Sequence, residues 1–102
     1  MIALEVTLNG KRICVAGAED LEVLTTSITA GGKLGKKTLS AGPDETCTFS
    51  YHVGGLTGRK DPKKDVHLGW KTDITLKVGD VIRVQLVETA KADRPKSRTS
   101  AR

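Results

Sequence analysis

Two cysteines and two histidines, Cys14, Cys47, His52 and His67, have the side-chain chemistry of zinc ligands. Structural zinc sites usually place their ligands in pairs two to four residues apart, so that each pair shares one turn of the chain. Here Cys47 and His52 are five residues apart, in a segment whose alternation puts them on opposite faces of a strand. The spacing therefore predicts no metal site and no cofactor, with Cys47 as a small core residue.

His67, three residues before Trp70, is the best single candidate for a catalytic base. A hydrolytic site would also need an activated hydroxyl and an orienting carboxylate. The sequence contains no nucleophile elbow, phosphate loop or metalloprotease helix, and its acidic residues are scattered over predicted turns and edges. We therefore predict that the protein is not an enzyme, and that His67 is a loop histidine packed beside a tryptophan.

The basic residues suggest phosphate binding, because 17 Lys and Arg against 12 Asp and Glu give a net charge of +5. Most of this excess lies in residues 91–102. Two loops carry further groups, Lys33, Lys36 and Lys37 in the first and Arg59, Lys60, Lys63 and Lys64 in the second. If both loops emerge at the same end of the fold, they and the tail form one surface for nucleic acid. A solubilising surface is the alternative, since the chain has few aromatic residues on which bases could stack.

The elements that must position these residues are β-strands. Ile2, Leu4, Val6 and Leu8 alternate with Ala3, Glu5 and Thr7, and Asn9-Gly10 is the dipeptide best suited to a type I′ turn. The pattern predicts an N-terminal hairpin in which Cys14 points away from the core. Its expected pairs are Leu8 with Lys11, Val6 with Ile13, and Leu4 with Val15.

Further strands are predicted over residues 21–30, 46–53 and 81–88, with Gly54-Gly55 closing the second of these. No segment shows a helical stripe, so the prediction is an all-β domain over residues 1–89. Six to eight short strands fit either a small antiparallel β-sandwich or an open barrel. Residues 90–102 do not alternate and are rich in small polar and basic residues, which predicts a disordered basic tail.

The expected location is cytoplasmic. No apolar run approaches the roughly 20 residues needed to span a bilayer, and no secretory signal is visible. In that compartment the two cysteines would remain reduced.

Four strings carry a resemblance to a group of small uncharacterised bacterial proteins. They are Leu8-Asn9-Gly10-Lys11-Arg12-Ile13-Cys14, His52-Val53-Gly54-Gly55-Leu56, His67-Leu68-Gly69-Trp70 and Leu76-Lys77-Val78-Gly79-Asp80. The resemblance implies a compact β domain over most of the chain. It implies no activity, cofactor or catalytic residue.

Trp70 and His67 are the predicted partner-binding residues. Tryptophan is enriched at interface hot spots, and Trp70 follows a glycine beside a charged loop. The leading hypothesis is a non-enzymatic module that binds another protein, in which case Trp70→Ala abolishes binding without changing the circular dichroism spectrum. The alternative is that Trp70 plugs one end of a core that has few aromatic residues. A second copy of the chain is a further candidate partner, because the apolar core is small.

Overall fold

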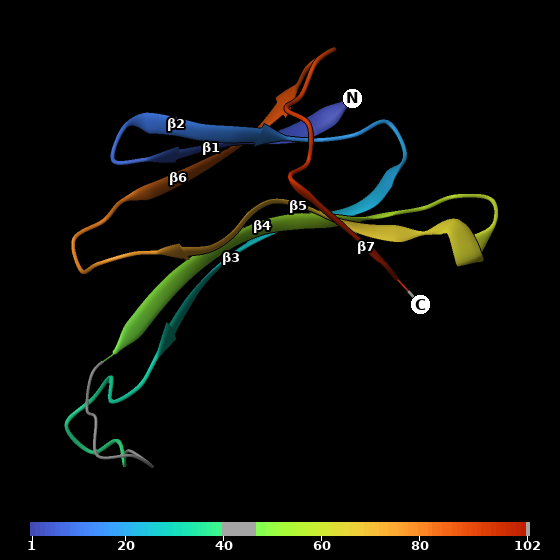
Figure 1. The fold of residues 1–102 in the computed structure, drawn as a ribbon. Helices are drawn as coiled ribbons and strands as arrows, with labels where there is room; N and C mark the ends of the chain where they lie inside the picture. The colour runs from blue at the N-terminus through green and yellow to red at the C-terminus, as the bar shows by residue number, and fades with distance from the viewer. Residues whose placement is uncertain (40–46, 102) are drawn as a thin grey trace.

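The computed structural model describes residues 1–39 and 47–101, apart from the side chains of residues 72 and 73. Its strands form two antiparallel sheets, which confirms the all-β prediction (Figure 1). The first sheet has the order β2-β1-β6, from β1 (Ile2–Leu8), β2 (Lys11–Ala16) and β6 (Ile82–Glu88). The second has the order β3-β4-β5-β7, from β3 (Leu21–Gly31), β4 (Thr48–Thr57), β5 (Val66–Thr75) and β7 (Ser97–Ser100). A single 3-10 turn, η1 (Pro62–Lys64), precedes β5.

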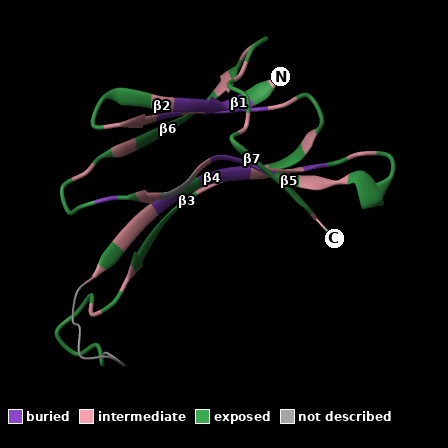
Figure 2. Cartoon of the chain, in the orientation of Figure 1, coloured by how far each residue is buried: buried purple, intermediate pink, exposed green. Residues whose placement is uncertain are grey.

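The two sheets share one hydrophobic core. Figure 2 shows the buried parts of the strands where the two layers face one another. This two-layer arrangement agrees with the sandwich alternative. The buried cluster consists of Leu4, Val6, Cys14 and Ala16 from the first sheet, Tyr51, Val53, Leu68 and Trp70 from the second, and Leu76.

The N-terminal hairpin has the predicted turn but a different register. Asn9 and Gly10 have φ angles of 52° and 82°, the positive values that a type I′ turn requires, and Leu8 pairs with Lys11. A bulge then skips Ile13, so that Val6 pairs with Cys14. The predicted pairing of Val6 with Ile13 is therefore wrong, as is that of Leu4 with Val15. Because a shift of one residue reverses the faces of a strand, Cys14 points into the core and is 3% exposed.

The buried position of Cys14 has a measurable consequence. Burial, and then the charge of Asp93, raise the pKa of the Cys14 thiol, so less of the reactive thiolate is present at neutral pH. Cys47 is only half-buried. We expect an aromatic disulfide reagent to modify one thiol quickly in the native protein and both thiols in denaturant. The buried Cys14 should react only slowly in the native protein, so Cys14→Ser should remove the slow reaction and leave the fast one. Two thiols that both react quickly in the native protein would contradict the bulged register.

Two other predicted boundaries differ from the structure. The strand expected over residues 46–53 continues through Gly54-Gly55 to Thr57, while residue 46 lies outside the described residues. These glycines lie within β4, where the chain closely approaches its neighbours. A Cβ atom at Gly55 would come within 2.7 Å of the Val23 carbonyl oxygen on β3. The absence of a side chain thus allows β3 and β4 to pair closely.

The prediction of a disordered tail is wrong for the part of it that the structure describes. After β6 the chain passes one end of the first sheet and descends to the second, where β7 pairs with β5 (Figure 1). Asp93 fixes this crossing. Its N–H donates to the Val15 carbonyl at 2.9 Å, and its Oδ2 accepts from the Val15 N–H at 2.8 Å. Backbone hydrogen bonds therefore order a segment that has little apolar surface of its own.

Candidate protein interface

Trp70 lies in the core and not on the surface. Its side chain is 1% exposed, and its indole Nε1–H donates to the Asp93 carbonyl at 2.8 Å. The side chain is therefore not available to a partner, contrary to the first interpretation of this residue. This position agrees with the alternative hypothesis for Trp70, in which the side chain fills space in the core between the sheets.

His67 lies on the outer face of the second sheet, in a groove of about 470 Å³. His52 lines the same groove, so the structure brings together two histidines that the sequence analysis treated separately. Gly54 pairs with Gly69, so no side chains rise from the floor between them. The described residues contain no group of three or more His, Cys, Asp or Glu side chains that could hold a metal ion. The groove therefore offers imidazole groups and, from Ser97 and Thr99, hydroxyl groups for hydrogen bonding.

The two basic loops lie at opposite ends of the second sheet. Lys33, Lys36 and Lys37 follow β3, whereas the other group follows β4, a strand of ten residues that extends over roughly 30 Å. The two loops do not form one surface. The tail, by contrast, does reach the second loop, because the Ala101 N–H donates to the Asp65 carbonyl at 3.1 Å.

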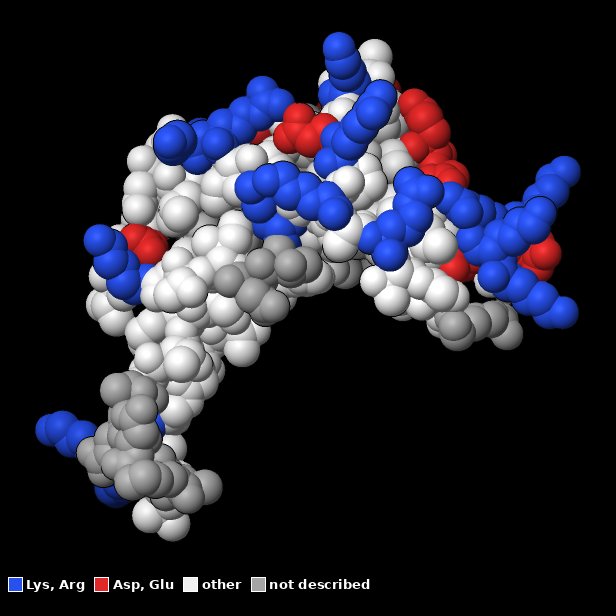
Figure 3. Space-filling model, in the orientation of Figure 1, with Lys and Arg blue, Asp and Glu red and all other residues white. Residues whose placement is uncertain are grey.

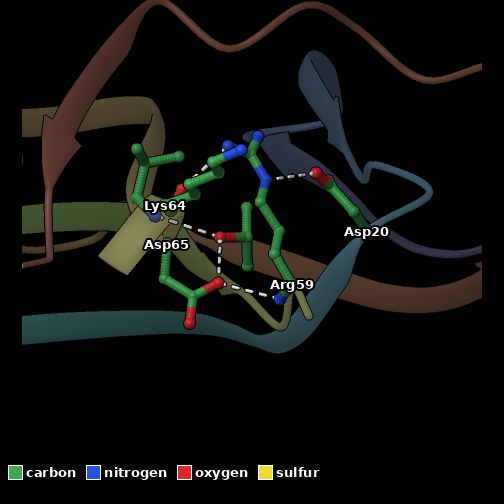
Figure 4. Close-up of polar contacts among 6 residues, drawn as sticks. Asp20, Arg59, Lys64 and Asp65 are labelled. Carbon is green, nitrogen blue, oxygen red and sulfur yellow. Dashed lines mark hydrogen bonds and ion pairs between the residues drawn. The ribbon is translucent and has the colours of Figure 1, made fainter. Parts of the chain in front are cut away.

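Arg59 is held by a local network at this second loop (Figure 4). Asp65 Oδ1 accepts from the Arg59 backbone N–H at 2.8 Å and from the Thr57 hydroxyl at 3.0 Å. The Arg59 guanidinium donates to Asp20 Oδ2 at 3.0 Å and to the Lys64 carbonyl at 2.8 Å. Two of its guanidinium N–H groups are thus used within the fold, and Arg59 stabilises the loop. The loop's exposed cations are Lys60, Lys63 and Lys64.

Lys and Arg side chains are spread over the face of the molecule seen in Figure 3. Two basic residues outside the predicted loops and tail, Lys71 and Arg12, lie beside residues of the segment between β6 and β7. Lys71 of β5 and Lys96, which immediately precedes β7, line one small cavity. Arg12 of β2 forms an ion pair with Asp93 at 3.7 Å. These residues are far apart in the sequence, so their proximity depends on the path of the tail.

The side of the molecule where β3 and β6 run leaves the core uncovered. Val84 and Leu86 of β6 pair with Val6 and Leu4, so they share the face of the sheet that points into the core. Nevertheless Val84 is 38% exposed and Leu86 is 73% exposed. Ile28 of β3, on the core-facing side of its own sheet, is 60% exposed. We call the surface formed by Ile28, Val84 and Leu86 the open side.

Within the part of the chain that the structure describes, both strands at the open side are unpaired along one edge. β3 and β6 are the outermost strands of their sheets, and residues of both line a cavity of about 250 Å³. From Val23 to Gly31, β3 contains no charged residue and no proline. Natural edge strands usually carry such residues, or bulges, because these prevent pairing with another chain. The open side therefore combines free backbone hydrogen-bonding groups with exposed apolar side chains.

Comparison with known proteins gives no relative from which a function could be transferred. No protein-family model, curated protein or solved structure matches this chain. No helix in the part of the chain that the structure describes is long and apolar enough to cross a membrane.

Proposed function

We propose that this protein is a protein-binding module whose partner covers the open side. The observation that supports the proposal is the exposure of three apolar side chains on faces that point into the core. Complete burial of an aliphatic side chain of this size contributes roughly 1.5–3 kcal/mol. The contribution here is smaller for Val84, much of which is already covered. A ligand that covers all three residues therefore has a substantial source of binding free energy.

The partner that best fits this surface is an extended segment with apolar residues at alternate positions. Such a segment can add to the free edge of β3 by main-chain hydrogen bonds. The added strand would extend the second sheet beneath β6, since packed sheets lie about 10 Å apart. Its inward side chains would then contact Ile28, Val84 and Leu86. An uncharged partner segment is favoured because β3 is uncharged from Val23 to Gly31.

A nuclear magnetic resonance titration tests this proposal with a synthetic peptide of alternating threonine and valine. We expect shifts in the amide signals of β3 and in the methyl signals of Ile28, Val84 and Leu86. Ile28→Lys and Leu86→Lys should each weaken binding at least about tenfold, because a charge then enters an apolar contact. Both side chains are more than half exposed, so the variants should remain folded.

Val78→Lys is the matched control, since Val78 is 86% exposed in the turn after β5, outside the open side. This variant should bind the peptide as the original chain does. A peptide that leaves the open-side methyl signals unchanged at millimolar concentration would refute the proposed mode. Equal weakening in all three lysine variants would also refute it, because the effect would then be one of net charge.

Nucleic-acid binding is a second candidate function. It is favoured by the contact between the tail and the second basic loop, which brings Arg98 toward the end of the sheet that carries Lys60, Lys63 and Lys64. Binding through phosphates weakens steeply with salt. Affinity for a single-stranded oligonucleotide that stays constant from low to physiological salt would exclude this candidate.

A further inference from the structure

Two lysines that are distant in the sequence line one cavity at the edge of the second sheet. Lys71 belongs to β5, and Lys96 immediately precedes β7. The Lys96 N–H donates to the Gly69 carbonyl at 2.8 Å, which holds Lys96 beside β5. Gly69, Trp70, Lys71, Lys96 and Ser97 line a cavity of about 230 Å³ that is open to solvent. Since Gly69 has no side chain, this part of the wall leaves room for a small ligand.

The two ammonium groups are close enough to affect each other. A direct side-chain contact with Lys96 lowers the pKa of Lys71, and burial and the positive charge of Lys96 lower it further. Two like charges placed side by side repel each other, and an anion shared between them relieves this repulsion. Their proximity follows from the backbone hydrogen bond at Gly69 and from the path of the tail.

The nearby carboxylate of Asp93 is engaged elsewhere. Its Oδ2 accepts from the Val15 N–H at 2.8 Å, and its Oδ1 lies 3.7 Å from the Arg12 guanidinium. The charge of Asp93 raises the pKa of Lys71, but Lys96 and burial outweigh it, so the pKa is lowered overall. The pair of lysines therefore retains an excess of positive charge.

We propose that the cavity between Lys71 and Lys96 binds a phosphate group. A tetrahedral oxyanion presents several acceptor oxygens, so each ammonium group can donate to a different one. Ser97 lines the same cavity as well as the groove of His67, and its hydroxyl is a further donor that the phosphate could use. The phosphate belongs either to free inorganic phosphate or to the backbone of a nucleic acid. This site lies apart from the open side and does not depend on the proposed protein-binding function.

Thermal unfolding of the full chain in phosphate and in chloride at equal ionic strength tests the site. Phosphate should raise the unfolding midpoint more than chloride does, because it binds only the folded state. Lys71→Met and Lys96→Met should each abolish this difference. In chloride both variants should unfold at the same temperature as the original chain or above it, since the repulsion has been removed. Lys77→Met, in the turn after β5, is the control and should keep the full effect of phosphate.

Equal midpoints in phosphate and chloride for the original chain would overturn the proposal. So would a phosphate effect that Lys71→Met and Lys96→Met leave intact. A short single-stranded oligonucleotide separates the two sources of phosphate. If the oligonucleotide displaces inorganic phosphate and loses at least about tenfold in affinity in both methionine variants, the site binds backbone phosphates. If the oligonucleotide neither displaces phosphate nor loses affinity in these variants, while phosphate still stabilises the chain, the ligand is free phosphate.

Discussion

Trp70→Ala is expected to lower the free energy of unfolding by about 3–5 kcal/mol. The side chain is 1% exposed between the two sheets, so its removal leaves a cavity in the shared core. The substitution also removes the donor to the Asp93 carbonyl. A domain of this size has a total stability of roughly 5–15 kcal/mol, so the loss is a large fraction of it. Urea unfolding followed by circular dichroism measures the change.

Trp70→Phe is the matched control for this substitution. Phenylalanine keeps most of the apolar volume and loses only the indole N–H, so the variant should be more stable than Trp70→Ala. An alanine variant with an unchanged urea midpoint would contradict the buried position of Trp70. If the prediction holds, a loss of partner binding in Trp70→Ala results from unfolding and does not identify a contact residue.

The second large effect is expected from a chain that ends at residue 90. This truncation removes β7 and the three hydrogen bonds of Asp93, two to Val15 and one from Trp70. At about 0.5–1.5 kcal/mol for each net hydrogen bond, those of Asp93 alone correspond to roughly 1.5–4.5 kcal/mol. The truncated chain should therefore unfold at a clearly lower temperature and be cleaved faster by proteases.

The full-length variant Lys91→Ala is a control that removes one of the five cationic side chains lost in the truncation, while it keeps β7 and Asp93. Lys91 is exposed. Its N–H and its carbonyl both form hydrogen bonds with the Thr89 hydroxyl, which the substitution leaves in place. It should unfold close to the temperature of the original chain. A truncated chain with the unfolding temperature of the full chain would restore the prediction of a disordered tail.

The strands could be predicted because their signal is local. Alternation at Ile2–Leu8 and the Asn9-Gly10 dipeptide suffice for one hairpin turn and one buried face. The bulge at Ile13 has no comparable local signal. The bulge arises from the pairing of two strands within a complete sheet. Because it shifts the register of β2, it is also the reason why Cys14 is buried.

The tail and the candidate interface depend on contacts between distant residues. Asp93 binds Val15 through its N–H and its carboxylate, and its carbonyl accepts from the Trp70 indole. The amino-acid composition of the tail does not reveal these contacts. Val84 and Leu86 lie on one side of the strand that was predicted over residues 81–88. Whether that side is covered depends on the order of strands in both sheets, and the sequence does not give this order.

The pairing of β1 with β6 determines when the first sheet can form. Ile2 pairs with Glu88, and the Met1 amino group donates to the Thr89 carbonyl at 2.9 Å across 88 positions. Contacts between residues so far apart slow folding, commonly to milliseconds or seconds for β proteins. At about 5–20 residues per second, the ribosome makes β6 roughly 4–16 s after β1. During that interval the nascent β1–β2 hairpin has an unpaired edge, at which a chaperone would have its earliest opportunity to bind.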